Sequence, residues 1–185
     1  SISMGKQSLN FPDLILGKGE LIALVGKNGV GKTNLLDAIY FSCFTKSYFS
    51  KPDSISSKTG YDGFNITGEF QKNNDILKVS VIFRENGKKE LIVDQEQISP
   101  FSSHIGRFPL VFIAPDDIIL ITGGSEERRN FIDTLLSQWD QTYLSHLIRY
   151  QKALLERNKF LKQSLIVVFR IRKHKAKNLK IKTTI

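Results

Sequence analysis

One eight-residue stretch constrains the fold of this chain more than any other feature of its sequence. Residues 26–33 read Gly-Lys-Asn-Gly-Val-Gly-Lys-Thr and match the pattern G-x-x-x-x-G-K-[ST]. The short apolar run in front of them, residues 20–25, has the length of a buried strand, and apolar residues recur at helical spacing over 32–44. The sequence therefore predicts a buried strand, a glycine-rich turn and a helix, in that order.

The residue types in this stretch suit the binding of a triphosphate. Glycines let the backbone turn tightly so that successive amides point inward, and the following helix adds the positive end of its dipole. In this pattern Lys32 reaches the β- and γ-phosphates, and the Thr33 hydroxyl ligates Mg²⁺. The alternative, a glycine-rich turn with an incidental lysine, does not explain the strand and helix patterns on either side. The predicted binding residues are Gly26, Lys27, Asn28, Gly29, Val30, Gly31, Lys32 and Thr33, and no catalytic residue is assigned.

The middle of the chain has the pattern of an antiparallel sheet. Residues 45–63 are rich in Ser, Lys, Gly and Asp and predict a loop. Three strand-like segments follow, and Asn86-Gly87 between two of them is a strong signal for a hairpin. A further buried strand is expected at 108–114, ended by Pro115. The three strand-like segments are residues 64–70, 76–84 and 89–94.

Two helices are predicted next. Glu126 and Glu127 suit the first turn of a helix over 126–138, because acids there complement the helix dipole. A second helix over 141–162 has apolar residues at heptad-like spacing. Both an antiparallel helical arm and a single amphipathic helix packed on a domain remain open for it. The spaced residues are Tyr143, Leu147, Tyr150, Leu154 and Leu161.

Charge and cysteine content bear on the partners and the cellular compartment expected of this chain. The net charge is +9, but the first 162 residues hold 20 basic and 18 acidic residues, while the last 23 hold 7 basic residues and no acid. Any nucleic-acid argument from total charge is therefore an argument about the tail. Cys43 is the single cysteine, which favours a reducing, cytoplasmic compartment. No apolar stretch approaches the ~20 residues of a membrane span, and no signal-peptide pattern is present.

Four ordered motifs resemble those of one family, the RecF and SMC-like ABC ATPases. Residues 26–40 resemble its N-x-x-G-K-T-N-[LI]-L-[DE]-A-I stretch, and Thr45–Phe49 resembles its T-x-S-[FHY] segment. Residues 112–117 are similar to F-[AS]-P-[ED]-D, and residues 123–133 to G-x-P-x-x-R-R-x-F-[IL]-D. The resemblance covers about residues 20–162.

The resemblance implies an α/β fold: a P-loop NTPase with an incomplete ABC-ATPase-type head, an antiparallel β subsection and the start of a helical lobe. It divides the chain into an ATP-binding head at 1–125, the start of the lobe at 126–162 and a basic tail at 163–185. It implies ATP and Mg²⁺ as cofactors and a role in DNA repair, replication, recombination and the SOS response. The implied partners are single-stranded or gapped duplex DNA, recombination mediator proteins, and a second copy in an ATP-dependent homodimer of the full-length protein.

The sequence departs from the family in three places. Ser8–Phe11 corresponds to the second strand of the family, and no opening strand is expected before it. A Walker B acid run and the LSxGQ-like signature do not occur in these 185 residues, so we expect weak ATP binding and negligible hydrolysis. From Gln163 the resemblance ends, which favours an out-of-frame tail. Two alternatives therefore stay open: a truncated, non-hydrolysing product and another P-loop NTPase such as a small-molecule kinase.

The remaining candidate residues have plain structural interpretations. His104, His146 and His174 lack acidic or cysteine partners at ligand spacing, so we predict no metal site at them. Cys43 is expected in the core. Arg128 and Arg129 suit either DNA contact or a solvated helix face. Ordinary surface charge is favoured over a DNA-contacting strip for Lys152, Arg157, Lys159 and Lys162.

Overall fold

The computed structural model divides the chain into two compact units, residues 1–141 and 142–185. It describes the backbone of residues 2–4, 7–9, 19, 21–49, 63–72 and 75–180, and the side chains of residues 19, 21–49, 63–71 and 75–163. The predicted loop at 45–63 lies largely outside this part of the chain, as do the residues between Lys72 and Asp75. Within the described residues, no helix is both long and apolar enough to cross a membrane.

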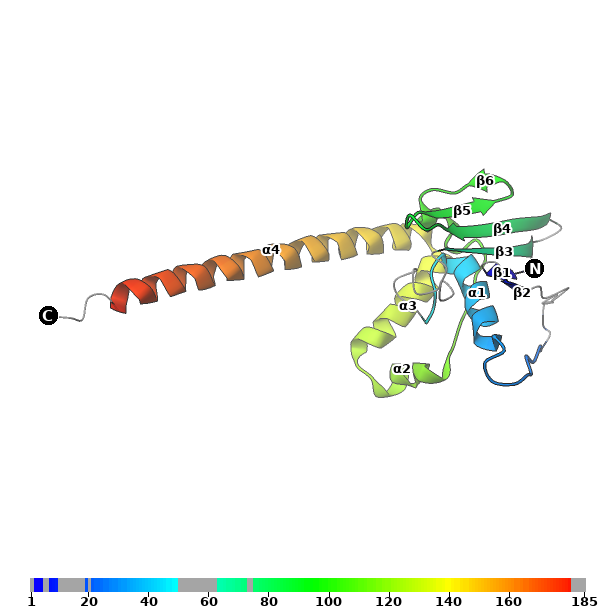
Figure 1. Ribbon diagram of the computed structural model, residues 1–185, viewed down its shortest axis with the longest axis horizontal. Coiled ribbons are helices and arrows are strands. Elements are labelled where there is room, and N and C mark those ends of the chain that lie inside the picture. Colours follow the sequence, from blue (N-terminus) through cyan, green and yellow to red (C-terminus); the bar gives the residue numbers. More distant parts are fainter. Residues whose placement is uncertain are drawn as a thin grey trace. The chain divides into compact units, whose positions relative to one another are not determined.

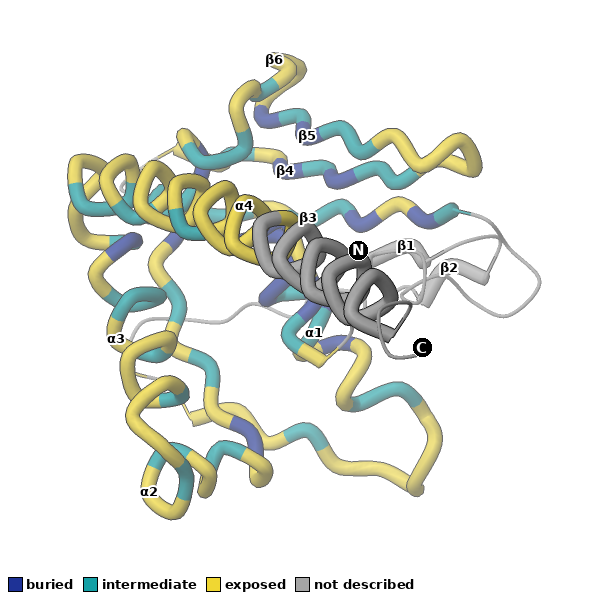
Figure 2. Tube along the Cα trace, turned by 90° about the vertical axis from the view of Figure 1, so that its left-hand side faces the viewer, coloured by how far each residue is buried: buried dark blue, intermediate teal, exposed yellow. Residues whose placement is uncertain are grey.

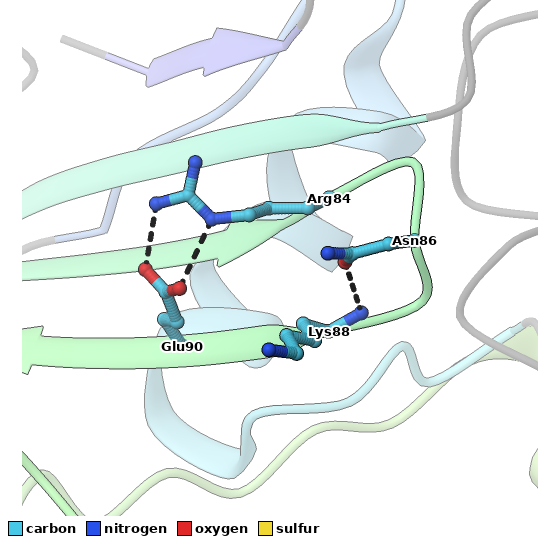
Figure 3. A network of polar contacts seen from close by, with 4 residues as sticks. All are labelled: Arg84, Asn86, Lys88 and Glu90. Atoms are coloured by element: carbon cyan, nitrogen blue, oxygen red, sulfur yellow. Dashed lines mark hydrogen bonds and ion pairs between the residues drawn. The ribbon is translucent and has the colours of Figure 1, made fainter.

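An antiparallel meander forms the main sheet, as predicted. Its strand order is β3-β4-β5-β6, and each strand pairs with the next along the chain. The turn between β4 and β5 contains the predicted Asn86-Gly87, with Gly87 at a φ of +76°. Figure 3 shows how Arg84 and Glu90 close this hairpin through two hydrogen bonds of 3.0 and 2.8 Å. The strands are β3 (Phe64–Lys72), β4 (Asp75–Phe83), β5 (Lys89–Val93) and β6 (Glu96–Gln97).

The core lies between one face of this sheet and the helix α1 (Lys32–Phe44). Strand side chains alternate between the two faces, so every second residue points at the helix. The pairs Ile66–Val81 and Val79–Val93 are in register and buried. Figure 2 shows the buried positions concentrated along α1 and these strands. The helix contributes Leu35, Ala38, Tyr40, Phe41, Cys43 and Phe44, so the predicted core position of Cys43 is confirmed.

A lysine fixes the C-terminal end of α1 on the sheet. Lys89 of β5 donates from Nζ to the carbonyl oxygen of Thr45, at a distance of 2.7 Å. Its ammonium lies 5.7 Å from the ring centroid of Phe41 and 5.5 Å from that of Phe101. A cation is favourable at the negative end of a helix dipole and over aromatic faces. This contact therefore sets where α1 ends relative to β5.

Two short strands precede α1. β1 (Ile2–Met4) pairs antiparallel with β2 (Gln7–Leu9), and β1 lies beside β3. The expectation of no strand before Ser8 is therefore wrong. Of the predicted second strand, Ser8 and Leu9 are in β2, whereas Asn10 and Phe11 lie outside the described residues.

Two predicted buried strands are not strands in the structure. Residues 21–27 form no strand, and Leu21 and Val25 are 99% and 93% exposed; Glu20 lies outside the described residues. Residues 109–114 also form no strand and pair with none in the described part of the chain, and Val111 and Ile113 are exposed. A parallel strand needs neighbours for its hydrogen bonds and for cover on both faces. No described strand pairs with either segment, so neither is covered on both faces. In 108–114, Phe108 and Ala114 are nevertheless buried, and Phe112 packs against the core.

The helices follow the predicted pattern more closely. η2 (Phe101–His104), η3 (Pro115–Ile118) and α2 (Ile119–Thr122) are short, and α3 spans Ser125–Trp139. Gly124 is the N-cap of α3, which therefore begins one residue before the predicted start at residue 126 and ends one residue after the predicted end. α4 runs from Gln141 to Lys180, so the predicted boundary at residue 162 lies within it. Figure 1 shows each element in sequence colours.

A buried histidine joins η2 to α1. His104 is 1% exposed, and its Nε2 donates to the carbonyl oxygen of Ser42 at 2.8 Å. That bond places the proton of the neutral ring on Nε2, while the buried Nδ1 has no partner among the described residues. Burial, and to a smaller extent the charge of Arg107, lower the pKa of His104 below its usual 6.5, against the effect of the Ser42 bond. The ring is therefore neutral in the folded protein at pH 7.

We predict that Leu91→Ala lowers the free energy of unfolding by about 2–5 kcal/mol, because Leu91 is fully buried between β5 and α1. Ile76→Ala, a deletion of similar size at a side chain that is 66% exposed, should change it by less than about 0.5 kcal/mol. Urea unfolding of both variants measures the difference. Equal losses would contradict this assignment of the core.

We also predict that acid destabilises the fold through His104. Below pH 6.5 the unfolded chain protonates this ring while the folded chain keeps it neutral, so the unfolded state binds more protons. The free energy of unfolding should therefore fall as pH drops below 6.5, by at most about 1.4 kcal/mol per pH unit for this one site. The fall should continue until pH reaches the lowered pKa of the folded protein.

The measurement compares unfolding free energies between pH 7.5 and 5 for three proteins. His104→Gln removes the titration and keeps an amide donor for Ser42, so its pH dependence should be flatter than that of the wild type. His146→Gln makes the same replacement at an exposed histidine of α4 and serves as the control for the substitution itself. A His104→Gln slope equal to that of the wild type would refute the assignment.

Candidate phosphate-binding site

The predicted phosphate loop is a turn that leads directly into α1. Gly29 and Gly31 have φ values of +83° and +96°, in the left-handed region where a side chain is strained. Gly31 is the N-cap of α1, and its carbonyl accepts the first helical hydrogen bond from Leu35 N at 2.9 Å. Among the described residues, no side-chain hydrogen bond caps this end of the helix, and its first turn has no acid. The positive end of the helix dipole therefore faces the loop.

Lys32 holds the loop in shape. Its Nζ donates to the carbonyl oxygens of Gly26 and Lys27, at 2.8 and 2.7 Å. The ammonium is therefore within the turn, beside the amides that precede α1. Thr33, the predicted Mg²⁺ ligand, is exposed in the first helical turn. The structure thus brings Lys32 together with the backbone of Gly26 and Lys27, while Thr33 follows in the first turn of α1.

The other loop positions leave the site open to solvent. Lys27, Asn28 and Val30 are all exposed, and Val30 is 54% exposed. Figure 2 shows the segment in front of α1 as largely exposed. The arrangement of two left-handed glycines, an uncapped helix start and one ammonium suits an anion with several oxygens.

A group of polar contacts behind the loop was not predicted. The Asp37 carboxylate on α1 accepts from Ser47 Oγ at 2.7 Å and from the Tyr48 amide at 2.8 Å. The Tyr48 hydroxyl donates to Asp117 Oδ1 at 2.5 Å, and the other oxygen of Asp117 accepts from Ala114 N at 2.6 Å. We call these five residues, Asp37, Ser47, Tyr48, Asp117 and Ala114, the Tyr48 link.

Aromatic packing supports the Tyr48 link. The Tyr48 ring is 5.1 Å from that of Tyr40 and 4.5 Å from that of Phe112, measured between centroids. Burial is the main cause that raises the pKa of Tyr48, and its hydrogen bond to Asp117 adds to the shift. Burial likewise raises the pKa of Tyr40 to about 12. The Tyr48 phenol is therefore a fixed hydrogen-bond donor at neutral pH.

Sequence motifs marked both ends of the Tyr48 link without showing that they touch. Thr45–Phe49 and residues 112–117 each matched a family pattern, but Tyr48 and Asp117 are 69 positions apart. Spacing within one segment carries no information about contacts at that separation. The coincidence of a tyrosine and an aspartate in two matched motifs is the signal that could have suggested the contact.

A cavity separates α1 from α2 and α3 next to the Tyr48 link. Its volume is about 280 Å³, and aromatic and aliphatic side chains form most of its wall. Two carboxylates, Asp117 and Glu127, reach it, and the buried Oε2 of Glu127 has no partner among the described residues. On the far side, the Gln138 amide of α3 bonds the backbone of Leu110 through both its nitrogen and its oxygen.

The candidate basic residues outside the loop either bind backbone carbonyls or are exposed. The Arg128 guanidinium donates to the carbonyl oxygens of Gly123 and Leu120, at 3.1 and 3.4 Å, and so caps α2. Arg129 is exposed, as are the four basic residues of α4 proposed as a possible strip. The described residues contain no cluster of three His, Cys, Asp or Glu side chains that could hold a metal.

Comparison with known proteins assigns these features to a family. A model of the AAA domain matches residues 1–184. The chain is 45% identical to the DNA replication and repair protein RecF of Cytophaga hutchinsonii over 156 residues, which are 84% of this chain and 41% of that protein. It is 46% identical to RecF of Flavobacterium johnsoniae over 138 residues, which are 75% of this chain and 38% of that protein. The chain belongs to the RecF family of AAA-domain proteins.

Two solved structures of the recombination mediator protein RecF in the RecFOR pathway share the fold of this RecF-family chain. The structure described as RecF-ATP has a TM-score of 0.68 at 29% identity and covers 74% of this chain and 37% of that one. The structure described as RecF-ATPrS has a TM-score of 0.69, and the match covers 75% of this chain and 38% of that one. The predicted fold class, a P-loop NTPase with part of an ABC-ATPase-type head, is confirmed. The chain spans about two fifths of the length of these relatives.

We predict that Gly31→Ala lowers the free energy of unfolding by about 1–2 kcal/mol, because an L side chain at a φ of +96° is strained. Gly68→Ala on β3 is the matched control, since Gly68 lies outside the left-handed region and a methyl group there meets only Phe70 at 3.4 Å. That change should be neutral or slightly stabilising. Thermal or urea unfolding measures both, and a neutral Gly31→Ala would argue against the described loop.

Proposed function

We propose that Gly26–Thr33 bind the triphosphate of ATP and that Thr33 contributes a ligand to its Mg²⁺. The observation that carries the proposal is the uncapped start of α1 behind two left-handed glycines, with the Lys32 ammonium inside the turn. On binding, Lys32 would exchange its two carbonyl acceptors for phosphate oxygens, which are stronger partners because they are charged. The ATP-bound state of the solved RecF relatives supports this ligand.

We further propose that the chain acts within a RecF-type DNA replication and repair protein. In this role the full-length protein binds single-stranded or gapped duplex DNA, forms an ATP-dependent homodimer and works with recombination mediator proteins to load recombinase in the cytoplasm. The names of the relatives support the repair role. The three-part division at residues 125 and 162, and negligible ATP hydrolysis by this chain alone, stay predictions.

Fluorescent-nucleotide titration of the 185-residue chain with Mg²⁺ tests the ATP site. Lys32→Ala should weaken ATP binding by about 10- to 100-fold, because a charge-assisted contact contributes about 1.5–3 kcal/mol. Lys88→Ala removes an equally charged, exposed lysine in the β4–β5 turn and should leave the affinity unchanged. Equal affinities of Lys32→Ala and the wild type would rule out the assigned loop.

A further inference from the structure

We propose that Tyr48 is a positioning residue: its hydroxyl transmits the state of the phosphate loop to the segment that leads into α2 and α3. The inference rests on the proposed binding of ATP at Gly26–Thr33. The Tyr48 link is continuous from α1 to η3, and each of its steps is a short hydrogen bond.

The first half of the Tyr48 link is rigidly attached to the phosphate loop. Asp37 follows Thr33 by four residues on α1, so both lie on the same side of the helix, one turn apart. Both carboxylate oxygens of Asp37 are used, by the Ser47 hydroxyl and the Tyr48 amide. Ser47 is 2% exposed, so water does not compete for this contact. A shift of α1 therefore carries the backbone of residues 47–48 with it.

The second half attaches Tyr48 to η3. One oxygen of the Asp117 carboxylate accepts a hydrogen bond from the Tyr48 hydroxyl. The other accepts from the backbone amide of Ala114, three residues earlier. This second bond closes the turn that begins η3, so the carboxylate fixes both the position and the shape of residues 114–118. From there the backbone continues into α2. Arg128 of α3 donates to the carbonyl oxygens of Leu120 in α2 and of Gly123 just after it.

A cavity of about 280 Å³ adjoins the Tyr48 link, with side chains of α1 on one side and those of α2 and α3 on another. Residues 110–112 also line it, and the Phe112 ring packs on the rings of Tyr40 and Tyr48. The Tyr48 hydroxyl therefore adds a directional polar connection from α1 to η3 beside this aromatic contact. A variant that keeps the ring and removes the hydroxyl separates the two contributions to a coupling free energy.

Hydrogen exchange of the 185-residue chain with and without Mg·ATP tests the inference. In the wild type, ATP should slow exchange at residues 26–35 and also at residues 114–122, the latter by about ten-fold, within the range usual for coupled sites. In Tyr48→Phe, which keeps the ring and its aromatic contacts, the effect at 114–122 should fall below about two-fold while that at 26–35 persists. A simple loss of packing would not separate the two segments in this way.

Tyr40→Phe is the matched control, because it removes a hydroxyl from the same aromatic cluster for which no hydrogen bond is recorded in the described structure. It should behave as the wild type does. Asp117→Ala tests the same contact from the other side, because it removes the acceptor of the Tyr48 hydroxyl. It should uncouple the two segments as Tyr48→Phe does, including if Tyr48→Phe fails to fold. Combined with Tyr48→Phe it should add nothing further.

The outcomes separate this inference from the proposed function. No protection of residues 26–35 by ATP in the wild type would overturn both. Protection there without any effect at 114–122, or an effect at 114–122 that survives Tyr48→Phe or Asp117→Ala, would overturn the role of Tyr48 alone. The same loss in Tyr40→Phe would assign the effect to ring packing and would also overturn it.

Discussion

The packing of α1 on the antiparallel sheet is the interaction on which the rest of the structure depends. The same thirteen-residue helix supplies most of the helical side of the core and begins at the phosphate loop. Its buried face meets the alternating apolar residues of β3, β4 and β5, and Lys89 fixes its C-terminal end. A helix held along its length in this way presents its free N-terminal amides at a fixed point. The loop itself needs little packing of its own and is largely exposed.

Sequence reasoning succeeded where the governing physics is local. Strand alternation, the Asn86-Gly87 turn and the apolar spacing of 32–44 each depend on neighbouring residues, and each element formed as expected. The family motifs likewise identified the loop and the fold class. The start of α3 was displaced by one residue because Gly124 and Ser125 are both acceptable near a helix start, and the backbone conformation decides between them.

Sequence reasoning failed where burial depends on distant segments. The runs at 20–25 and 108–114 have the composition of central strands, but composition does not supply the neighbours that would cover them. In the described structure, alternate residues of 110–114 differ in burial. Phe112 packs on Tyr40 and Ala114 is buried, while Val111 and Ile113 are exposed. The Tyr48 link escaped prediction for the same reason, since a contact across 69 positions leaves no periodic pattern.

The half-covered segment at 109–114 has a practical consequence. A segment with exposed apolar side chains that pairs with no strand among the described residues is a template for intermolecular β-pairing. Leu21 and Val25, shortly before the phosphate loop in sequence, form a second such segment. At high protein concentration these surfaces would favour self-association over the monomer. Charged substitutions at the exposed apolar positions of these two segments would then oppose such association.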